Sequence, residues 1–146
     1  MCESMVRVMA SGVFDLIHTG HVSYLEQAKS YGDELVVVVA CDSTVRRRKH
    51  EPITPEAMRA RIVGALKPVD MAIIGRDGDM FETVRELRPD VIVLGFDQTF
   101  DEVEMRRRLE GIGMGHVRVL RADECADDLN ATRRIVQKIR NGGADQ

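Results

Sequence analysis

The chain contains no tryptophan, only three cysteines and no apolar run long enough to cross a membrane. Its longest clean apolar run, residues 35–41, is seven residues long, whereas a helix that spans a bilayer needs about 18 or more. The polar N-terminal stretch also lacks the apolar centre of a signal peptide. These absences predict a cytoplasmic protein without a membrane partner.

The cysteines are too few and too widely spaced to form a recognisable framework. Cys2, Cys41 and Cys125 are odd in number and include no C-x-x-C pair, so neither a disulfide scaffold nor a zinc knuckle is indicated. Reduced thiols are the ordinary state of such residues in the cytoplasm. The sequence therefore predicts no metal site held by the protein.

An excess of charge of one sign is also missing. Lys and Arg number 21 against 24 Asp and Glu, which gives a net charge of −3 and does not favour nucleic acid or an anionic membrane as a partner. The one basic run, RRRK at residues 46–49, is short and has no interleaved aromatic residues. We therefore expect no nucleic-acid partner.

The chain does contain an alternation of strand-like and helix-like segments. Five apolar runs have the length and composition of strands: residues 6–10, 35–40, 71–75, 91–95 and, more weakly, 117–120. The second and fourth, LVVVVA and VIVLG, are nearly continuous runs of hydrophobic residues. Strands that are buried on both faces of a parallel sheet have this composition.

Helical patterns separate these runs: residues 18–31, a segment opened by Thr54 and Pro55, a short segment opened by Asp79 and ending before Pro89, residues 101–110 and residues 127–140. Pro55 suits a first helical position, and Met58, Ile62 and Leu66 repeat at a spacing of four, as in an apolar helix stripe. Asp79 with Glu82 has the pattern of a capping box.

This alternation predicts βαβ units with right-handed crossovers. The expected fold is α/β: a single doubly wound, Rossmann-like domain over residues 1–146, with a core of about residues 6–140. A five-stranded parallel sheet would carry helices on both faces. Because such folds bind ligands beyond the carboxyl ends of their strands, we expect functional residues after the first, second and fourth strands.

The segment GVFDLIHTGH, residues 12–21, lies at the junction of a strand and a helix. Gly12 lets the backbone turn and approach a ligand closely. His18 and His21 share one face of the first helical turn, whose unpaired N–H groups attract phosphate. Gly20 leaves room between them, and two imidazoles add charge-assisted donors. The segment therefore predicts a phosphate site.

Two other interpretations of these histidines stay open. They can be surface or capping residues without a chemical role. They can also be zinc ligands, although paired histidine ligands are commonly four residues apart and no third ligand is convincing.

The same segment resembles the GxFDxxHxGH signature of the nucleotidyltransferases of the cytidylyltransferase-like superfamily. The resemblance implies that ATP or CTP binds with its phosphates over the histidines, accompanied by Mg²⁺ or another divalent cation. A phosphate oxygen of the second substrate would attack the α-phosphorus, and pyrophosphate would leave. Such a transfer depends chiefly on positioning and charge stabilisation.

The resemblance also implies roles for individual residues. His18 and His21 would be catalytic and would stabilise the charge of the α-phosphate. The nucleotide would be bound by Val13, Phe14, His18, Thr19, Gly20, His21 and Asp97. Asp15 would orient the loop.

Four positions are further candidates by resemblance. Lys49 would reach the substrate phosphates, although a solvated face explains the basic run as well. Arg59 in EAMRARIV resembles the arginine of an E-x-x-R helix near the nucleotide, with an exposed helix residue as the alternative. Asp97 in GFDQTFDE matches a GxD turn at the crevice, with a plain Asx-turn as the alternative. Thr132 in LNATRRIV would contact phosphate, together with Arg133 or Arg134, although Asn130 and Ala131 depart from the family's pattern.

Nearly the whole chain is similar to the archaeal FAD synthases, which are FMN adenylyltransferases. The similarity runs through GDELVVVVACDSTV, ALKPVDMAIIG and LRPDVIVLGFDQTFDE. Two departures are Thr19, where that group commonly has Pro, and a single cysteine in the tail, where that group tends to have more. The resemblance implies ATP and FMN as substrates and a homodimer as the assembly.

Two other functions are kept as alternatives. A CTP-dependent glycerol-3-phosphate cytidylyltransferase, or an enzyme for a similar small phosphate ester, is one of them. With 4% aromatic residues the chain shows no obvious stacking platform for isoalloxazine, although apolar and Met side chains can serve instead. The other alternative is a non-catalytic α/β nucleotide sensor, which would not require both histidines.

Overall fold

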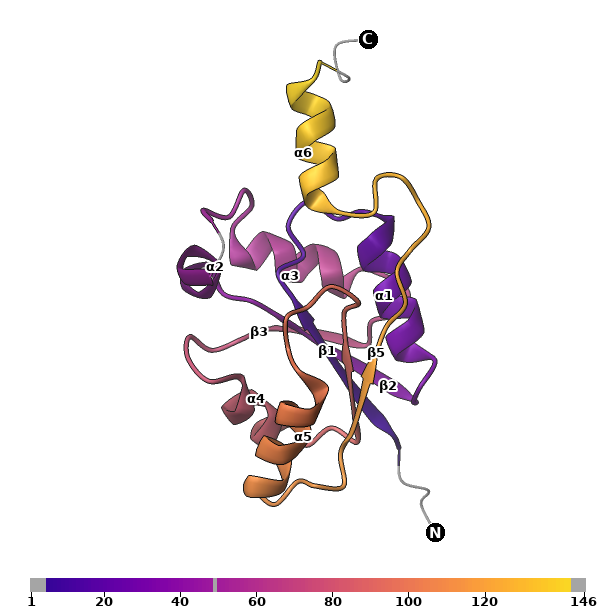
Figure 1. Cartoon of the computed structure of the whole chain (residues 1–146), viewed down its shortest axis with the longest axis vertical. Helices are drawn as coiled ribbons and strands as arrows, with labels where there is room; N and C mark the ends of the chain where they lie inside the picture. The colour runs from indigo at the N-terminus through magenta and orange to yellow at the C-terminus, as the bar shows by residue number, and fades with distance from the viewer. Residues whose placement is uncertain (1–4, 49, 143–146) are drawn as a thin grey trace.

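The computed structural model describes residues 5–48 and 50–142 (Figure 1). The elements are β1 (Arg7–Gly12), α1 (Thr19–Lys29), β2 (Glu34–Val39), α2 (Asp42–Arg48), α3 (Glu56–Gly64), β3 (Met71–Ile74), α4 (Met80–Leu87), β4 (Val91–Leu94), α5 (Glu102–Gly111), β5 (Arg118–Arg121) and α6 (Thr132–Arg140). The five strands form one parallel sheet in the order β3-β2-β1-β4-β5. The predicted α/β, doubly wound, Rossmann-like fold is confirmed.

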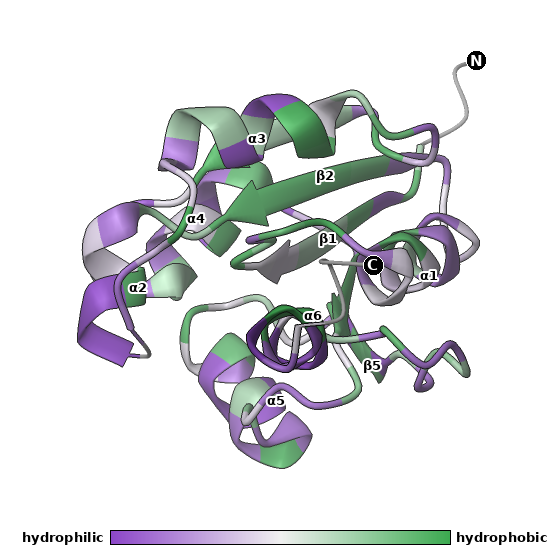
Figure 2. Ribbon diagram, turned by 90° about the horizontal axis from the view of Figure 1, so that it is seen from above, coloured by the Kyte–Doolittle hydropathy of each residue, from purple (hydrophilic) through white to green (hydrophobic). Residues whose placement is uncertain are grey.

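Helices cover both faces of the sheet because successive side chains of a strand point to opposite faces. Val8 and Ala10 of β1 pack in one core with residues of α1 and α3. Met9, between them, packs in a second core with residues of α4 and α5. Figure 2 shows the hydrophobic strand β2 under α3, in the interior of the molecule.

The strand order reverses between β1 and β4. The chain runs outward from β1 through β2 to β3, and then crosses to β4 and β5 on the other side of β1. The pairing of β1 with β4 joins Val8 to Val91 and ends where Ala10 meets Val93. Ligands of doubly wound folds bind in the crevice at this point.

Helix α3 differs from its sequence prediction. Pro55 is the N-cap instead of the first helical residue, and the buried residues are Arg59 and Val63. Met58 and Ile62 of the predicted stripe are 50% and 40% exposed. The apolar repeat indicated a helix correctly but named the wrong face, because the face against the sheet includes a buried arginine.

Three smaller differences concern helix boundaries. Helix α2 was not predicted, because it buries only Val45 and so has no apolar repeat. Helix α6 begins at Thr132 instead of residue 127. Asp79 caps α4 by accepting the N–H of Phe81, whereas Glu82 of the expected capping box lies beside Arg76.

No helix within the described parts of the chain is long and apolar enough to cross a membrane.

Candidate active site

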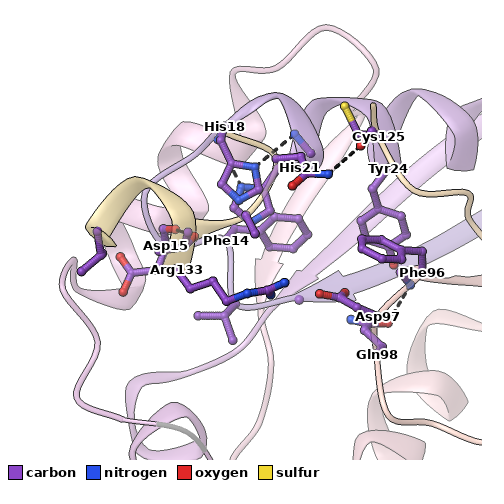
Figure 3. A pocket seen from close by; sticks show the side chains of 18 of the residues that line it. Phe14, Asp15, His18, His21, Tyr24, Phe96, Asp97, Gln98, Cys125 and Arg133 are labelled. Carbon is purple, nitrogen blue, oxygen red and sulfur yellow. Dashed lines mark hydrogen bonds between the residues drawn. The ribbon is translucent and has the colours of Figure 1, made fainter. Parts of the chain in front are cut away.

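A cavity of about 760 Å³ lies beyond the carboxyl ends of β1 and β4 (Figure 3). Its size is within the range of small-molecule sites. The walls bring together eight residues singled out from the sequence: Val13, Phe14, Asp15, His18, Gly20, His21, Asp97 and Thr132. Thr19 and Arg59 are not among the lining residues, and Lys49 lies outside the described residues.

His18 and His21 form a reciprocal cap at the start of α1. Nδ1 of His18 accepts the N–H of Gly20 at 3.0 Å, and Nδ1 of His21 accepts the N–H of His18 at 3.3 Å. The two rings stack with their centroids 3.8 Å apart. Because each Nδ1 is an acceptor, each neutral ring carries its proton on Nε2. Capping therefore fixes the tautomer that can donate to a ligand through Nε2.

The protonation of His18 is compatible with the charge-assisted donation expected from the sequence, in which either partner can carry the charge. Burial lowers the pKa of His18 below its usual 6.5, and the charge of Asp97 only partly opposes this effect. A proton on Nδ1 would also break the hydrogen bond from Gly20. Burial and the cap therefore favour the neutral ring of His18, and in a bond to phosphate the charge assistance would come from the phosphate oxygen.

The loop after β1 has an unusual backbone that is held by one buried carboxylate. Phe14 and Leu16 have φ of 57° and 53°, a left-handed conformation that costs roughly 1–3 kcal/mol in a non-glycine residue. Asp15, only 3% exposed, accepts the N–H groups of Ile53 at 2.6 Å and Thr54 at 3.1 Å. Asp15 thereby ties this strained loop to the segment before α3.

The charge of Asp15 is stable in this position. Burial alone would raise its pKa, but the hydrogen bonds from the Thr54 side chain and from the N–H groups of Ile53 and Thr54, with the nearby Arg59, lower the pKa below the ordinary 3.8. Both carboxylate oxygens are engaged by these donors. Asp15 therefore orients the loop and does not offer a free carboxylate to a ligand.

Arg59 lies beneath the site. Its side chain is fully buried and pairs with Asp42. The guanidinium donates to the carbonyl oxygens of Val13 at 2.8 Å, Ala40 at 2.7 Å and Thr54 at 2.9 Å. Arg59 is thus neither an exposed helix residue nor placed to touch a nucleotide. It ties together the loops after β1 and β2.

A second cavity of about 340 Å³ adjoins the first. The two share the wall formed by Ser11, Gly12, Val13, Asp97 and Gln98. The remainder of the smaller cavity is largely apolar, with two arginines among its lining residues: Met9, Val38, Val45, Met80, Phe100, Arg48 and Arg76. Asp97 therefore stands between two chambers, a placement that its sequence motif alone did not indicate.

More of the segment after β5 lies at the cavity than Thr132 and the neighbouring arginine expected from the sequence. Residues of this loop and of α6 form a whole wall of the larger cavity, including Arg133, Gln137 and Arg140. The spacing of these three residues, which places them on one face of a helix, could have predicted this wall from the sequence.

The loop before α6 has no periodic pattern, but it approaches the start of α1 closely. The backbone oxygen of Asn130 lies 2.2 Å from where a Cβ on Gly20 would stand. Gly20 is required by this close approach.

No group of three or more His, Cys, Asp or Glu side chains among the residues of known placement is arranged to hold a metal ion. Cys41 and Cys125 are both free thiols.

A helix start with a fixed pair of imidazole donors, set at the switch point of a parallel sheet, is typical of α/β enzymes that bind phosphate groups. The cytidylyltransferase-like family matches residues 9–136. The chain therefore belongs to the cytidylyltransferase-like family and is a nucleotidyltransferase, as the histidine segment predicted.

Relatives are similar over most of their length. The FAD synthase of Aciduliprofundum boonei is 54% identical over 136 residues, which cover 92% of this chain and 91% of the relative. The FAD synthase of Thermoplasma acidophilum is 50% identical, with coverage of 92% and 94%. A crystal structure described as the lipopolysaccharide core biosynthesis protein from Thermoplasma volcanium has a TM-score of 0.82 at 48% identity and covers 84% of this chain and 99% of that chain.

Proposed function

We propose that the chain is an FMN adenylyltransferase, which transfers AMP from ATP to FMN and forms FAD and pyrophosphate. The observation that carries the proposal is a pair of cavities that share one wall at the histidine-capped helix. About half of the residues are identical to those of two FAD synthases. Two adjoining chambers suit a reaction that joins two nucleotides.

The larger cavity would hold ATP, with its phosphates at the start of α1. Nε2 of His18 and Nε2 of His21 would donate to the α-phosphate oxygens, where negative charge builds in the transition state. Arg133 extends from α6 into the space near the histidines and Asp97 (Figure 3). It would meet the leaving pyrophosphate, for which a cation provides charge stabilisation.

The smaller cavity would hold FMN. Met9, Met80 and Phe100 give it apolar walls. Such walls suit an isoalloxazine ring, and the methionines can take the place of aromatic stacking residues, in which the chain is poor. Glycerol-3-phosphate would leave these apolar walls uncovered, so the geometry favours the flavin over the polyol alternative.

The bond changes are those of a direct displacement. An FMN phosphate oxygen at the shared wall forms a bond to the α-phosphorus, the bond from that phosphorus to the bridging oxygen breaks, and its electron pair leaves with pyrophosphate. The FMN phosphate is already ionised at pH 7, so the step needs no general base. The absence of a required base is consistent with the proposed roles of His18 and His21, which are hydrogen-bond donors.

ATP would enter as its complex with Mg²⁺ or another divalent cation. Mg²⁺ usually binds through substrate phosphates and one or two carboxylates, so a dedicated cluster of protein ligands is not required. Asp97 is the carboxylate at the shared wall that fits such a minor role.

A panel of substrates tests the proposal. Purified protein is incubated with ATP or CTP and with FMN, glycerol-3-phosphate or a sugar phosphate, while pyrophosphate is measured. We expect release with ATP and FMN. Release only with CTP and a polyol or sugar phosphate would replace FMN by another acceptor, and ATP binding without release from any pair would favour a nucleotide sensor.

We further propose that the enzyme works in the cytoplasm as a homodimer. Exposed apolar side chains at the sheet edge support the dimer: Met71 and Ile74 of the edge strand β3 are 49% and 39% exposed. Met58 and Ile62 of α3, the helix that packs beside β3, are also exposed. An uncharged apolar edge strand is open to pairing with a second copy. Light scattering on the eluted protein would show twice the chain mass, and a monomer at micromolar concentration would contradict the dimer.

A further inference from the structure

Beyond the last residue pair of β1 and β4, side chains make the hydrogen bonds that backbone groups make within the sheet. Ser11 lies one residue beyond the last β1–β4 pair. Its N–H donates to the hydroxyl of Tyr24 at 3.1 Å, and that hydroxyl donates to the carbonyl of Val93 at 2.5 Å. Burial raises the pKa of Tyr24, so the hydroxyl keeps its proton. The crevice therefore opens at a defined point, with the backbone groups of both strands satisfied.

Gln98 extends this connection into the loop after β4. Its Nε2 donates to the carbonyl of Ser11 at 2.8 Å, while its Oε1 accepts the N–H of Gly95 at 2.9 Å. One amide group thus joins the carboxyl end of β1 to that of β4. A side chain without both a donor and an acceptor cannot make this link.

Arg121, at the end of β5, also hydrogen-bonds to the backbone of the loop after β4. One terminal nitrogen of the guanidinium donates to the carbonyls of Gly95 at 2.9 Å and Gln98 at 2.8 Å. The other donates to the carbonyl of Phe100, and Nε pairs with Glu102. Only the planar fork of arginine presents this many donors in fixed directions, and lysine does not.

The residue displayed by this loop is Asp97, which lines both cavities (Figure 3). Its carboxylate is close enough to act on the charge of His18. Among the described residues, Gln98 and Arg121 hydrogen-bond to the backbone on both sides of Asp97, so the position of Asp97 depends on the backbone that they fix.

We propose that Gln98 and Arg121 form a clamp that holds Asp97 at the wall shared by the two cavities, and that both are positioning residues for the transfer. The kinetic part of this inference rests on the proposed function, whereas the geometric part does not. Misplacing a wall residue by about 1 Å can lower a rate roughly 100-fold.

Two variants and one control test the clamp. Arg121→Lys keeps the charge but not the fork, and Gln98→Met keeps the length but neither polar group. Arg118→Lys is the matched control, because Arg118 lies on the same strand and is exposed. The turnover rate with ATP and FMN is measured together with the melting temperature and the NMR titration of His18, whose signal is identified by its loss in His18→Asn.

We expect both clamp variants to lose about 10-fold to 100-fold in kcat and to titrate His18 at lower pH than the wild type, because Asp97 moves away. Arg118→Lys should change neither quantity. If Arg121→Lys fails to fold, Gln98→Met alone decides the test.

Wild-type titration of His18 in the folded variants would overturn the clamp, whether or not the rate falls. A clear shift of the titration in an enzyme that shows no FMN turnover would support the clamp and reject the proposed function separately.

Discussion

At the scale of single residues, His18 uses its two ring nitrogens for different purposes. Nδ1 caps α1 through the N–H of Gly20, and Nε2 is the atom that would donate to phosphate. A substitution can therefore separate the structural role from the catalytic role. Asparagine is suitable because its side-chain oxygen caps helices well but does not reach as far as Nε2.

We predict that His18→Asn keeps the stability of the wild type while kcat falls by about 10²–10³, the usual loss for one removed transition-state donor. His18→Ala should lose the rate and also about 1 kcal/mol of unfolding free energy, because the cap is gone. Pyrophosphate release and urea unfolding measure the two effects. Equal stability of the two variants would show that the cap contributes nothing.

The titration of His18 provides a second prediction. Because the folded-state pKa lies below 6.5, the folded protein resists protonation of this ring. The stability contributed by this group is fully present above pH 6.5 and is lost as the pH falls below that value through the folded-state pKa. We expect an NMR midpoint below 6.5, and a still lower one in Asp97→Asn. A midpoint at or above 6.5 would contradict the buried, neutral ring.

Some residue roles could be predicted from the sequence and others could not. The histidine pair was identifiable because its spacing and its position after an apolar strand are local features. The role of Arg59 was not, since its partners Val13, Ala40 and Asp42 come from the loops after β1 and β2 and from the start of α2. A buried arginine on a helix has the same letter pattern as an exposed one.

At the scale of elements, the start of α1 and the loop before α6 depend on each other. A Cβ at Gly20 would lie 2.2 Å from the Asn130 carbonyl and 2.8 Å from Cε1 of His18. This contact would be a steric clash, and because the Asn130 oxygen belongs to the backbone, relieving the clash requires the whole loop to move. The glycine in the histidine motif therefore serves packing between two elements, in addition to the access to phosphate that we propose for it.

We predict that Gly20→Ala lowers the unfolding free energy by about 1–3 kcal/mol, as overpacking does, and weakens ATP binding. Gly111→Ala is the control, because nothing lies within 4 Å of a Cβ at that position. This control should be neutral or gain up to about 1 kcal/mol. Urea unfolding measures both variants, and an unchanged stability of Gly20→Ala would rule out the close approach.

Helix α6 presents one face to the larger cavity and buries none of its residues. We predict that Arg140→Gln raises the KM for ATP about two- to fivefold with little change in kcat, as expected for an exposed ion pair. Lys138→Gln, on the same helix but not a lining residue, should leave KM unchanged. The effect of Arg140→Gln should fade at high salt, and equal KM values for the two variants would contradict the assignment.

Elements with a strong apolar pattern were predictable from sequence, and those without one were not. The strands β2 and β4 were recognisable because burial on both faces requires continuous hydrophobic residues. Helix α2 was missed because only Val45 is buried. The loop after β5 was not recognised as a cavity wall because its own part in the contacts with α1 is made by backbone groups of Asp123 and Asn130.

At the scale of the whole molecule, the order β3-β2-β1-β4-β5 brings the functional segments together. Residues of the loops after β1, β4 and β5 meet at one end of the sheet although up to about 120 positions separate them in the chain. The sequence predicted this edge because parallel strands share the direction of their carboxyl ends. It did not predict two chambers, since their shared wall is formed by residues from two loops that are far apart in the chain, those after β1 and β4.

In the proposed reaction, the AMP group of ATP, with its α-phosphorus, passes to the phosphate of FMN. The most direct measurement uses ATP labelled with ³²P at either the α or the γ position and separates the products chromatographically. The α label should appear in FAD and the γ label in pyrophosphate, and His18→Asn should slow both. Absence of label from FAD, with α label instead in free AMP or in another acceptor, would contradict the account.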